Sequence, residues 1–172
     1  ILCPEQFATR KKHSSDMLSF AVSSLIQHAK STKSEIFILF MDISKAYDRT
    51  WREGVWYKLL RSHNNQTDVA IAMALYGKIK TAVKHGCRAG PFKESDVGVG
   101  QGSPTSPELF CSLISGLPSA LRRNGVSMEV FGMTIACFIF LDDIAIPLPS
   151  LNILPKALSS VFGYAERWHF TF

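Results

Sequence analysis

The stretch FIFLDDIAI, Phe138 to Ile146, places two adjacent carboxylates, Asp142 and Asp143, in the middle of an apolar run. The apolar residues on both sides predict two strands that fold back at the aspartates. An Asp-Asp pair taken alone is more often turn chemistry than a functional site, because Asp favours turns. Partial burial of two neighbouring negative charges is unfavourable, and either protonation or a bound cation relieves it.

A second stretch, EIFILFMD, ends on another carboxylate. It is β-prone and apolar on both faces, which predicts a central strand ending at Asp42. If this strand neighbours the hairpin, Asp42, Asp142 and Asp143 converge at one rim of a sheet. A hard divalent ion would neutralise them, and Mg²⁺ needs only one or two carboxylates in addition to substrate phosphates. We therefore interpret the Asp142–Asp143 pair as one half of a predicted magnesium site, with Asp42 as the other half.

The rest of the pattern predicts an α+β domain, a small antiparallel sheet with helices packed on one face. A first helix is expected over residues 14–30, capped by Ser14 or Ser15. Pro118 is expected to break or restart the helix that begins at residue 106. A last helix over residues 154–168 has an expected inward face of Leu158, Val161, Phe162, Ala165 and Trp168.

The segment KIKTAVKH, residues 78–85, alternates in polarity and predicts a half-exposed strand. The following residues, GCRAGP at 86–91, predict a turn. Further along the chain, β-structure is expected from residue 128 onward, with a fold-back at Gly132.

Length and composition indicate one globular domain. The chain has 172 residues, of which 47% are hydrophobic and 19% charged. Its formal charge of +5 suits a polyanionic partner without requiring one. The four cysteines are scattered and form no zinc-binding pattern, and no stretch is long enough to predict a membrane span. Because the chain lacks an initiator Met and stops within RWHFTF, we interpret it as an excerpt of a longer polypeptide.

Three blocks occur in order along the chain: FMDISKAYDRTW from Phe40, VGVGQGSPTSPELF from Val97, and FLDD from Phe140. Each resembles a signature block of reverse transcriptases, especially those of non-LTR (LINE-like) retrotransposons. Upstream, EQFATRKKHSSDML is similar to a segment of the fingers in that family. Downstream, YAERWHFTF resembles the start of the block that ends the palm. The resemblance covers essentially the whole chain.

The resemblance implies a right-hand polymerase palm with partial fingers and without a thumb, in a single domain over residues 1–172. Residues 1–35 would belong to the fingers side and residues 36–172 to the palm. The implied reaction transfers a nucleotide from a dNTP to a primer 3′-OH on an RNA template, within a retrotransposon polyprotein that also carries a thumb and an endonuclease. Such elements act in nuclei and in cytoplasmic ribonucleoprotein particles; no membrane is implied.

The resemblance also assigns roles to the carboxylates. Asp42 and Asp142 would hold two Mg²⁺ ions, with Mn²⁺ as a substitute, while Asp143 assists and the Ile43 carbonyl adds a ligand. Tyr47 would stack under the sugar and exclude a 2′-OH, which favours dNTPs. Without the resemblance, Tyr47 is better interpreted as a core aromatic on a short helix.

The glycine-rich block has two interpretations. A lone glycine loop often means only tight turns. By resemblance, its backbone approaches the nucleotide and template closely, with Gln101 and Gly102 in contact. Two residues depart from the family pattern, Gly100 in place of the more frequent Arg and Leu141 in place of Ala. Arg10 lies in a basic cluster that is most simply a solvated charge run; by resemblance it contacts the triphosphate or template backbone.

Three alternatives stay open on the sequence. An RNA-dependent RNA polymerase would share the mechanism, but the aromatic at Tyr47 argues against it. A decayed or domesticated copy would bind nucleic acid without catalysis; the three intact aspartates argue against decay, and Gly100 and Leu141 keep it open. A metal-dependent phosphohydrolase would not need the glycine-rich block.

Overall fold

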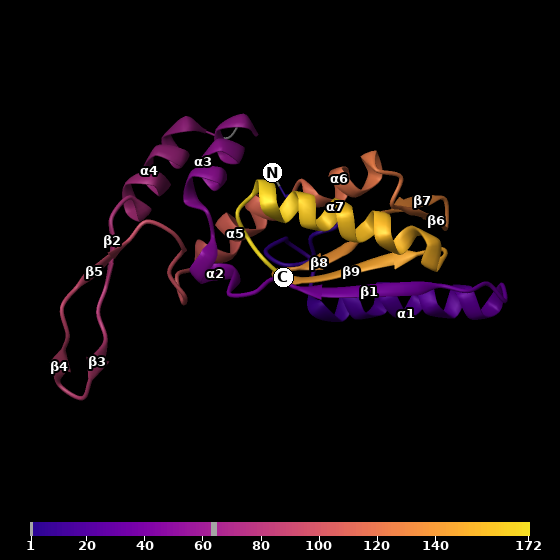
Figure 1. The fold of residues 1–172 in the computed structure, drawn as a ribbon, viewed down its shortest axis with the longest axis horizontal. Helices are drawn as coiled ribbons and strands as arrows, with labels where there is room; N and C mark the ends of the chain where they lie inside the picture. The colour runs from indigo at the N-terminus through magenta and orange to yellow at the C-terminus, as the bar shows by residue number, and fades with distance from the viewer. Residues whose placement is uncertain (1, 63–64) are drawn as a thin grey trace.

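The computed structural model describes residues 2–62 and 65–172, so residues 1 and 63–64 of the predicted single domain lie outside it. A three-stranded antiparallel sheet with the order β1-β9-β8 carries the fold (Figure 1). The strands are β1 (Phe37–Asp42), β8 (Phe138–Phe140) and β9 (Asp143–Leu148). The prediction of a central β1 is wrong, because β9 lies in the middle and β1 pairs only with β9 among the described strands.

The register of the sheet follows from the turn at the aspartates. Strand β9 pairs with β1 from Phe37↔Leu148 to Asp42↔Asp143, and with β8 up to Phe140↔Asp143. The turn between β8 and β9 therefore contains only Leu141 and Asp142. Leu141 takes a left-handed φ of +56°, as the first residue of a tight hairpin turn commonly requires. The predicted fold-back at the aspartates is confirmed.

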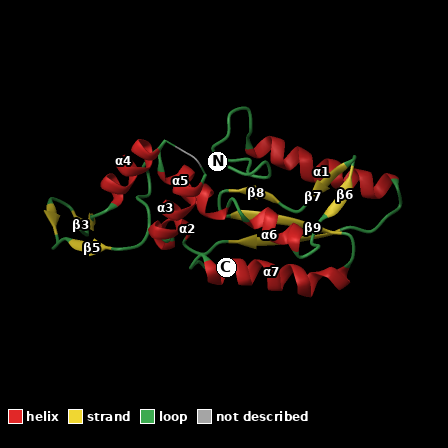
Figure 2. Ribbon diagram, turned by 90° about the horizontal axis from the view of Figure 1, so that it is seen from above, coloured by secondary structure: helices red, strands yellow, loops and turns green. Residues whose placement is uncertain are grey.

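Helices cover both faces of the sheet, so the prediction of helices on one face is wrong. Alternate side chains of β9, such as Ile144 and Ile146, pack against α5 (Ser106–Ile114), α6 (Leu117–Arg123) and α7 (Leu154–Arg167). On the opposite face, α1 (Ser15–Ser31) packs against Phe138 and Ala145. Figure 2 shows α1 and α7 on opposite sides of the sheet. The pleat sends successive residues to opposite faces, and the apolar residues on both sides of β1 and β9 require two covers.

Two helix predictions hold and one is corrected. Ser14 caps α1 by accepting a hydrogen bond from the Met17 N–H at 3.3 Å. Pro118 stands in the first turn of α6, where the helical run restarts. The predicted inward face of α7 is wrong at Phe162, which is exposed and packs on Phe172, while Tyr164 is buried.

Between β1 and α5 the chain leaves the sheet and returns. It passes through α2 (Ala46–Arg49), α3 (Arg52–Arg61) and α4 (Gln66–Tyr76) and then forms a long hairpin. The hairpin contains β2 (Ile79–Thr81), β3 (Lys84–His85), β4 (Arg88–Ala89) and β5 (Lys93–Ser95). The strand predicted over 78–85 is therefore split into β2 and β3, and β4 lies inside the predicted turn.

A second hairpin and a short helix complete the chain. Strands β6 (Met128–Val130) and β7 (Met133–Ile135) fold back at Gly132, as predicted. A 3-10 turn, η1 (Leu151–Ile153), leads into α7. Over the described ranges, no helix has the length and apolar character needed to cross a bilayer.

Candidate active site

The sheet brings the predicted carboxylates to one end. Asp42 at the end of β1 is the register partner of Asp143 at the start of β9. Residues directly opposite in an antiparallel pair hold their Cβ atoms about 4.5–5.5 Å apart on one face. Asp142 lies in the adjoining turn, and its carbonyl oxygen accepts a hydrogen bond from the Ile43 N–H at 3.2 Å. One backbone contact thus ties the end of β1 to the turn that carries Asp142.

The electrostatics of this end reflect crowded negative charge. The pKa of Asp143 is raised above its ordinary value by burial first, and then by the negative charges of Asp142 and Asp42. The pKa of Tyr47 is raised by burial and, to a smaller extent, by Cys111 and Asp142. The charge of Asp142 is therefore felt both by the neighbouring carboxyl and by the Tyr47 hydroxyl.

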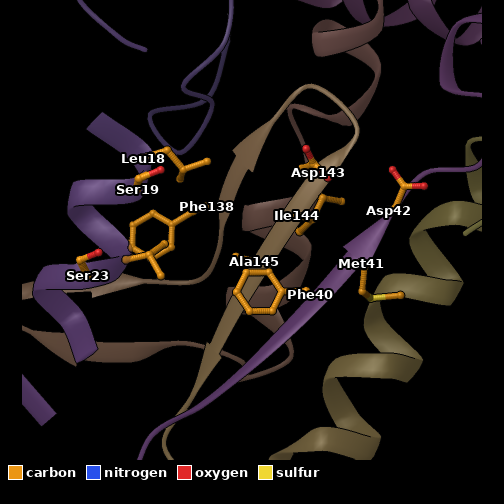
Figure 3. A pocket seen from close by; sticks show the side chains of 11 residues that line it. Leu18, Ser19, Ser23, Phe40, Met41, Asp42, Phe138, Asp143, Ile144 and Ala145 are labelled. Carbon is orange, nitrogen blue, oxygen red and sulfur yellow. The ribbon is translucent and has the colours of Figure 1, made fainter. Parts of the chain in front are cut away.

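A cavity of about 580 Å³ opens on the α1 side of this end. Figure 3 shows Asp42 and Asp143 entering it from neighbouring strands, with Phe40 and Phe138 along its length. Phe40 is 70% exposed although it belongs to a sheet strand. The cavity wall is mainly apolar apart from the two carboxylates and two serines of α1. Its lining residues are Leu18, Ser19, Val22, Ser23, Phe40, Met41, Asp42, Phe138, Asp143, Ile144 and Ala145.

The donor set fits a divalent cation that brings further ligands with it. Within residues 2–62 and 65–172, no three Asp, Glu, His or Cys side chains are arranged to hold an ion without help. Two adjacent carboxylates are nevertheless the hard oxygen donors that Mg²⁺ takes alongside substrate phosphates and water. Burial first, and then repulsion from Asp142 and Asp42, raises the pKa of Asp143, and a bound cation would relieve both effects.

Tyr47 lies between the carboxylate end and the glycine-rich loop. It belongs to the short helix α2, and its half-buried ring stands 5.8 Å from the ring of Phe110 in α5. Its carbonyl oxygen accepts a hydrogen bond from the Val99 N–H at 2.8 Å. The ring is thus placed by packing on Phe110, and the backbone of Tyr47 is held by the loop.

The glycine-rich loop is docked onto α2 by close backbone contact. The Gly98 N–H donates to the Thr50 carbonyl oxygen at 2.8 Å, with a left-handed φ of +87° at Gly98. A Cβ at this position would stand 2.7 Å from the Asp48 carbonyl oxygen, so a side chain does not fit. The Gln101 amide donates to the Asp48 carboxylate at 3.1 Å, and the exposed Gly102 has φ +86°. The backbone of the glycine-rich loop therefore makes its close contact with α2 of the same chain.

Arg10 is not brought to the carboxylates by any contact in the described chain. Its guanidinium donates to the Pro4 carbonyl oxygen at 2.6 Å and to the Gln6 carbonyl oxygen at 3.5 Å. These bonds close a loop in the segment before α1. The predicted contact of Arg10 with a triphosphate or template stays a prediction.

Gln6 supports the turn, a role that was not predicted from the sequence. Its side chain is 0% exposed, and Oε1 accepts hydrogen bonds from the N–H groups of Ala8 (3.0 Å) and Leu141 (3.3 Å). The segment around it runs alongside β8, where Gln6 and Ile139 form a parallel bridge. A glutamine in an otherwise basic and apolar segment could have indicated such a role, but only the fold shows which turn it holds.

Comparison with known proteins identifies the family. The family described as reverse transcriptase (RNA-dependent DNA polymerase) matches residues 1–172. The chain belongs to the reverse transcriptase family. The RNA-directed DNA polymerases from mobile element jockey of Drosophila funebris and Drosophila melanogaster are 28% and 25% identical to it, over 95% of the chain. The chain spans 18% of the length of each relative. The predicted reverse transcriptase of the non-LTR retrotransposon type is confirmed.

Two solved telomerase structures resemble this fold. An apo telomerase from Candida tropicalis, truncated from its C-terminal domain, superposes with a TM-score of 0.60 at 13% identity, over 87% of this chain and 31% of that chain. A telomerase from Candida albicans, in complex with a TWJ fragment of telomeric RNA, gives 0.67 at 17% identity, over 91% and 29%. At these identities the likeness concerns the fold, which agrees with the palm-like arrangement predicted.

Proposed function

We propose that this chain is the fingers and palm part of an RNA-directed DNA polymerase from a retrotransposon polyprotein. It transfers a nucleotide from a dNTP to a primer 3′-OH on an RNA template. The observation that carries the proposal is the register pair Asp42↔Asp143 with Asp142 in the adjoining turn. Family membership and the jockey relatives support the same reaction.

In the proposed mechanism, Asp42 and Asp142 hold two divalent ions, Mg²⁺ or Mn²⁺, and Asp143 and the Ile43 carbonyl assist. When bound, the ions supply activation of the primer hydroxyl and neutralisation of the triphosphate and leaving pyrophosphate. The chain's own contribution is positional. The register of β1 and β9 holds two of the carboxylates together, and the turn is tied to β1 through the Ile43 N–H.

The residues around the carboxylates are proposed to select and place the substrate. Tyr47, packed on Phe110, presents its ring beside the charge of Asp142 and limits space at the 2′ position of the sugar. Gln101 and Gly102 stand exposed next to α2, where they are proposed to contact a nucleotide or template. Arg10 is proposed to reach the template backbone. The formal charge of +5 suits these polyanionic partners.

Primer extension on an RNA template tests the proposal. Asp42→Asn and Asp142→Asn should each abolish dNTP incorporation, because a neutral amide removes the charge needed to hold the ions. Their circular dichroism spectra should match that of the parent protein. Asp68→Asn, which changes a carboxylate in the first turn of α4, is the matched control and should keep activity. Extension by either active-site variant at the parent rate would refute the proposal.

The same assay separates the alternatives. Incorporation of rNTPs in preference to dNTPs would identify an RNA-dependent RNA polymerase. Tight binding of primer–template with no extension by the parent protein, in Mg²⁺ or Mn²⁺, would identify a copy that binds nucleic acid without catalysis.

A further inference from the structure

The hairpin between α4 and the glycine-rich loop projects from the body of the protein. We call residues 78–97, with strands β2, β3, β4 and β5, the β-arm. Figures 1 and 2 both show it extending away from the sheet and its covering helices. Its strands pair antiparallel along two short ladders, Ile79–Thr81 with Lys93–Ser95 and Lys84–His85 with Arg88–Ala89. The β-arm is therefore ordered without a core of its own.

One buried guanidinium fixes the root of the β-arm. Arg52, at the start of α3, is 5% exposed. It donates hydrogen bonds to the carbonyl oxygens of Tyr76 (2.7 Å), Asp96 (3.2 Å) and Ser95. Tyr76 precedes the outgoing strand, and Ser95 and Asp96 end the returning one. Both legs are thus anchored to the same helix, which sets the direction of the β-arm relative to the carboxylate end.

The β-arm carries an excess of positive charge. It has five basic residues, Lys78, Lys80, Lys84, Arg88 and Lys93, and two acidic ones, Glu94 and Asp96. Lys80 forms an ion pair with Glu94 at 3.2 Å, where the two residues are register partners. Within the part of the chain that the structure describes, Lys84, Arg88 and Lys93 take part in no ion pair.

The face of the β-arm that carries Lys93 continues into the active-site region. Register partners share a face, so Lys93 lies with Thr81 on the side opposite the Lys80–Glu94 pair. On that side, a cavity of about 370 Å³ at the root is lined by Ile79 and Thr81 and reaches Asp48 and Gln101. The charge of Lys93 therefore lies on the face that leads along this cavity to Asp48 of α2 and to the glycine-rich loop.

Exposed apolar side chains accompany the charge. Val83 is 81% exposed and Phe92 is 72% exposed, although both lie in the hairpin. His85 adds a second exposed ring near the tip. Positive charge interleaved with exposed rings suits single-stranded nucleic acid, because unpaired bases stack on aromatic faces while cations contact the phosphates. A paired duplex offers no free base faces to such rings.

We propose that the β-arm binds the single-stranded part of the nucleic acid template, which passes around the narrow two-stranded arm. Lys84 and Arg88, on opposite faces of the β3–β4 ladder, and Lys93 contact the phosphates, and Phe92 lies against a base. The contact is independent of base sequence, since phosphates and stacking carry it. Only the description of this strand as the template rests on the proposed function. The binding surface itself needs no catalysis.

The test measures binding of a single-stranded RNA oligonucleotide by fluorescence anisotropy over a series of salt concentrations. The triple variant Lys84→Ala/Arg88→Ala/Lys93→Ala should bind more weakly, and its slope of log K against log salt should be shallower by about 2. The matched control is Lys30→Ala/Lys33→Ala/Lys156→Ala, which removes the same charge from exposed sites on α1, the following loop and α7. The control variant should keep most of the parent protein's slope of log K against log salt.

A second variant reports the stacking contact. Phe92→Ala leaves the charge unchanged and should weaken single-stranded RNA binding by roughly five- to a hundredfold. Binding of a blunt duplex should change little. Equal losses in the two triple variants, or a loss confined to the duplex, would overturn the proposal.

Measuring both RNA binding and primer extension in the parent protein, the Asp142→Asn protein and the β-arm variants separates this inference from the proposed function. If the parent protein does not extend primers and the β-arm variants still lose binding, the proposed function fails and the β-arm proposal holds. If extension depends on Asp142 while the β-arm variants bind as well as the matched control, the β-arm proposal fails and the proposed function holds.

Discussion

At the level of single residues, the pKa of the Asp143 carboxyl is raised by burial first and then by the like charges around it. Asp42 faces it across the register, and Asp142 precedes it in the turn. Such repulsion opposes folding unless solvent or a cation compensates for it. The hairpin turn and its tie to the Ile43 N–H hold the three residues together regardless. An arrangement that stores repulsion at an open cavity is typical of functional sites.

Tyr47 supplies the first residue-level prediction. Tyr47→Ala should raise the acceptance of ribonucleotides, because it removes the ring proposed to limit space at the 2′ position. Tyr47→Phe keeps the ring and should keep the selectivity, so it is the matched control. The measurement is the ratio of kcat/KM for dNTP and rNTP in primer extension. An unchanged ratio in Tyr47→Ala would rule out the gate.

Gln6 supplies the second residue-level prediction. Gln6→Leu leaves the buried N–H groups of Leu141 and Ala8 without their acceptor, and it also removes an amide nitrogen that has no partner among the described residues. We expect a net destabilisation of about 1–2 kcal/mol, measured by equilibrium urea unfolding. Gln27→Leu changes an exposed glutamine of α1 and should stay within about 0.5 kcal/mol of the parent. Equal stability of all three proteins would contradict the assigned support.

At the level of elements, Lys58 joins three helices. It belongs to α3, and its ammonium group donates to the Leu113 carbonyl oxygen of α5 and to the Tyr164 hydroxyl of α7. It also lies 4.0 Å from the ring centroid of Trp168, a cation–π contact that favours the charged form. Burial acts in the other direction and lowers its pKa from 10.5 to about 7.

This lowered pKa makes stability depend on pH. Between pH of about 7 and 10, the unfolded chain keeps the Lys58 proton and the folded chain releases it, so stability rises with pH. Below pH of about 7 the full cost of burying the charge is present. Lys58→Met should flatten this rise, as followed by urea unfolding at several pH values across the window. Lys156→Met, on the exposed side of α7, should retain it; a flat profile in the parent would contradict the prediction.

At the level of the whole molecule, the apolar core does not depend on the carboxylates. Ile144 and Ile146 pack on one face of the sheet, while Phe138 and Ala145 pack on the other. The carboxylates lie at the end of β1 and the start of β9. The β-arm projects away from this layered structure (Figure 1). The fold should therefore form without metal, and metal binding should add stability to a structure that already exists.

Magnesium should raise the thermal midpoint without being required for folding. At a concentration about ten times its Kd, one bound ion adds about 1.4 kcal/mol, or about 3–5 °C for a domain of this size. Asp42→Asn/Asp142→Asn should abolish the shift. Differential scanning calorimetry with MgCl₂, compared with NaCl of equal ionic strength, measures it. Unfolding of the parent in EDTA, or an equal shift in both proteins, would contradict this picture.

Several local features were predictable because short-range chemistry sets them. The run FIFLDDIAI gives a hairpin, since β-prone residues flank a pair that favours turns. Ser14 caps α1 because its hydroxyl reaches the third residue along. The convergence of Asp42 with the hairpin was predicted only conditionally, because nothing within either stretch states that β1 and β9 are neighbours.

Other features depend on contacts between residues far apart in the chain. The apolar character of β1 predicts that other elements pack on both of its faces. It does not indicate which helix covers each face, or whether a strand flanks β1 on each side. The support that Gln6 gives to Leu141, and the anchoring of the β-arm by Arg52, join residues separated by 135 and 24 to 44 positions.

The amino-acid order alone thus established the hairpin, the capped helix and the family, because periodicity, turn chemistry and motif spacing are local properties of the chain. Three-dimensional packing chose β9 as the middle strand, laid α1 on the second face and set Asp42 opposite Asp143. These choices minimise exposed apolar area over the entire molecule, and no short segment contains enough information to make them.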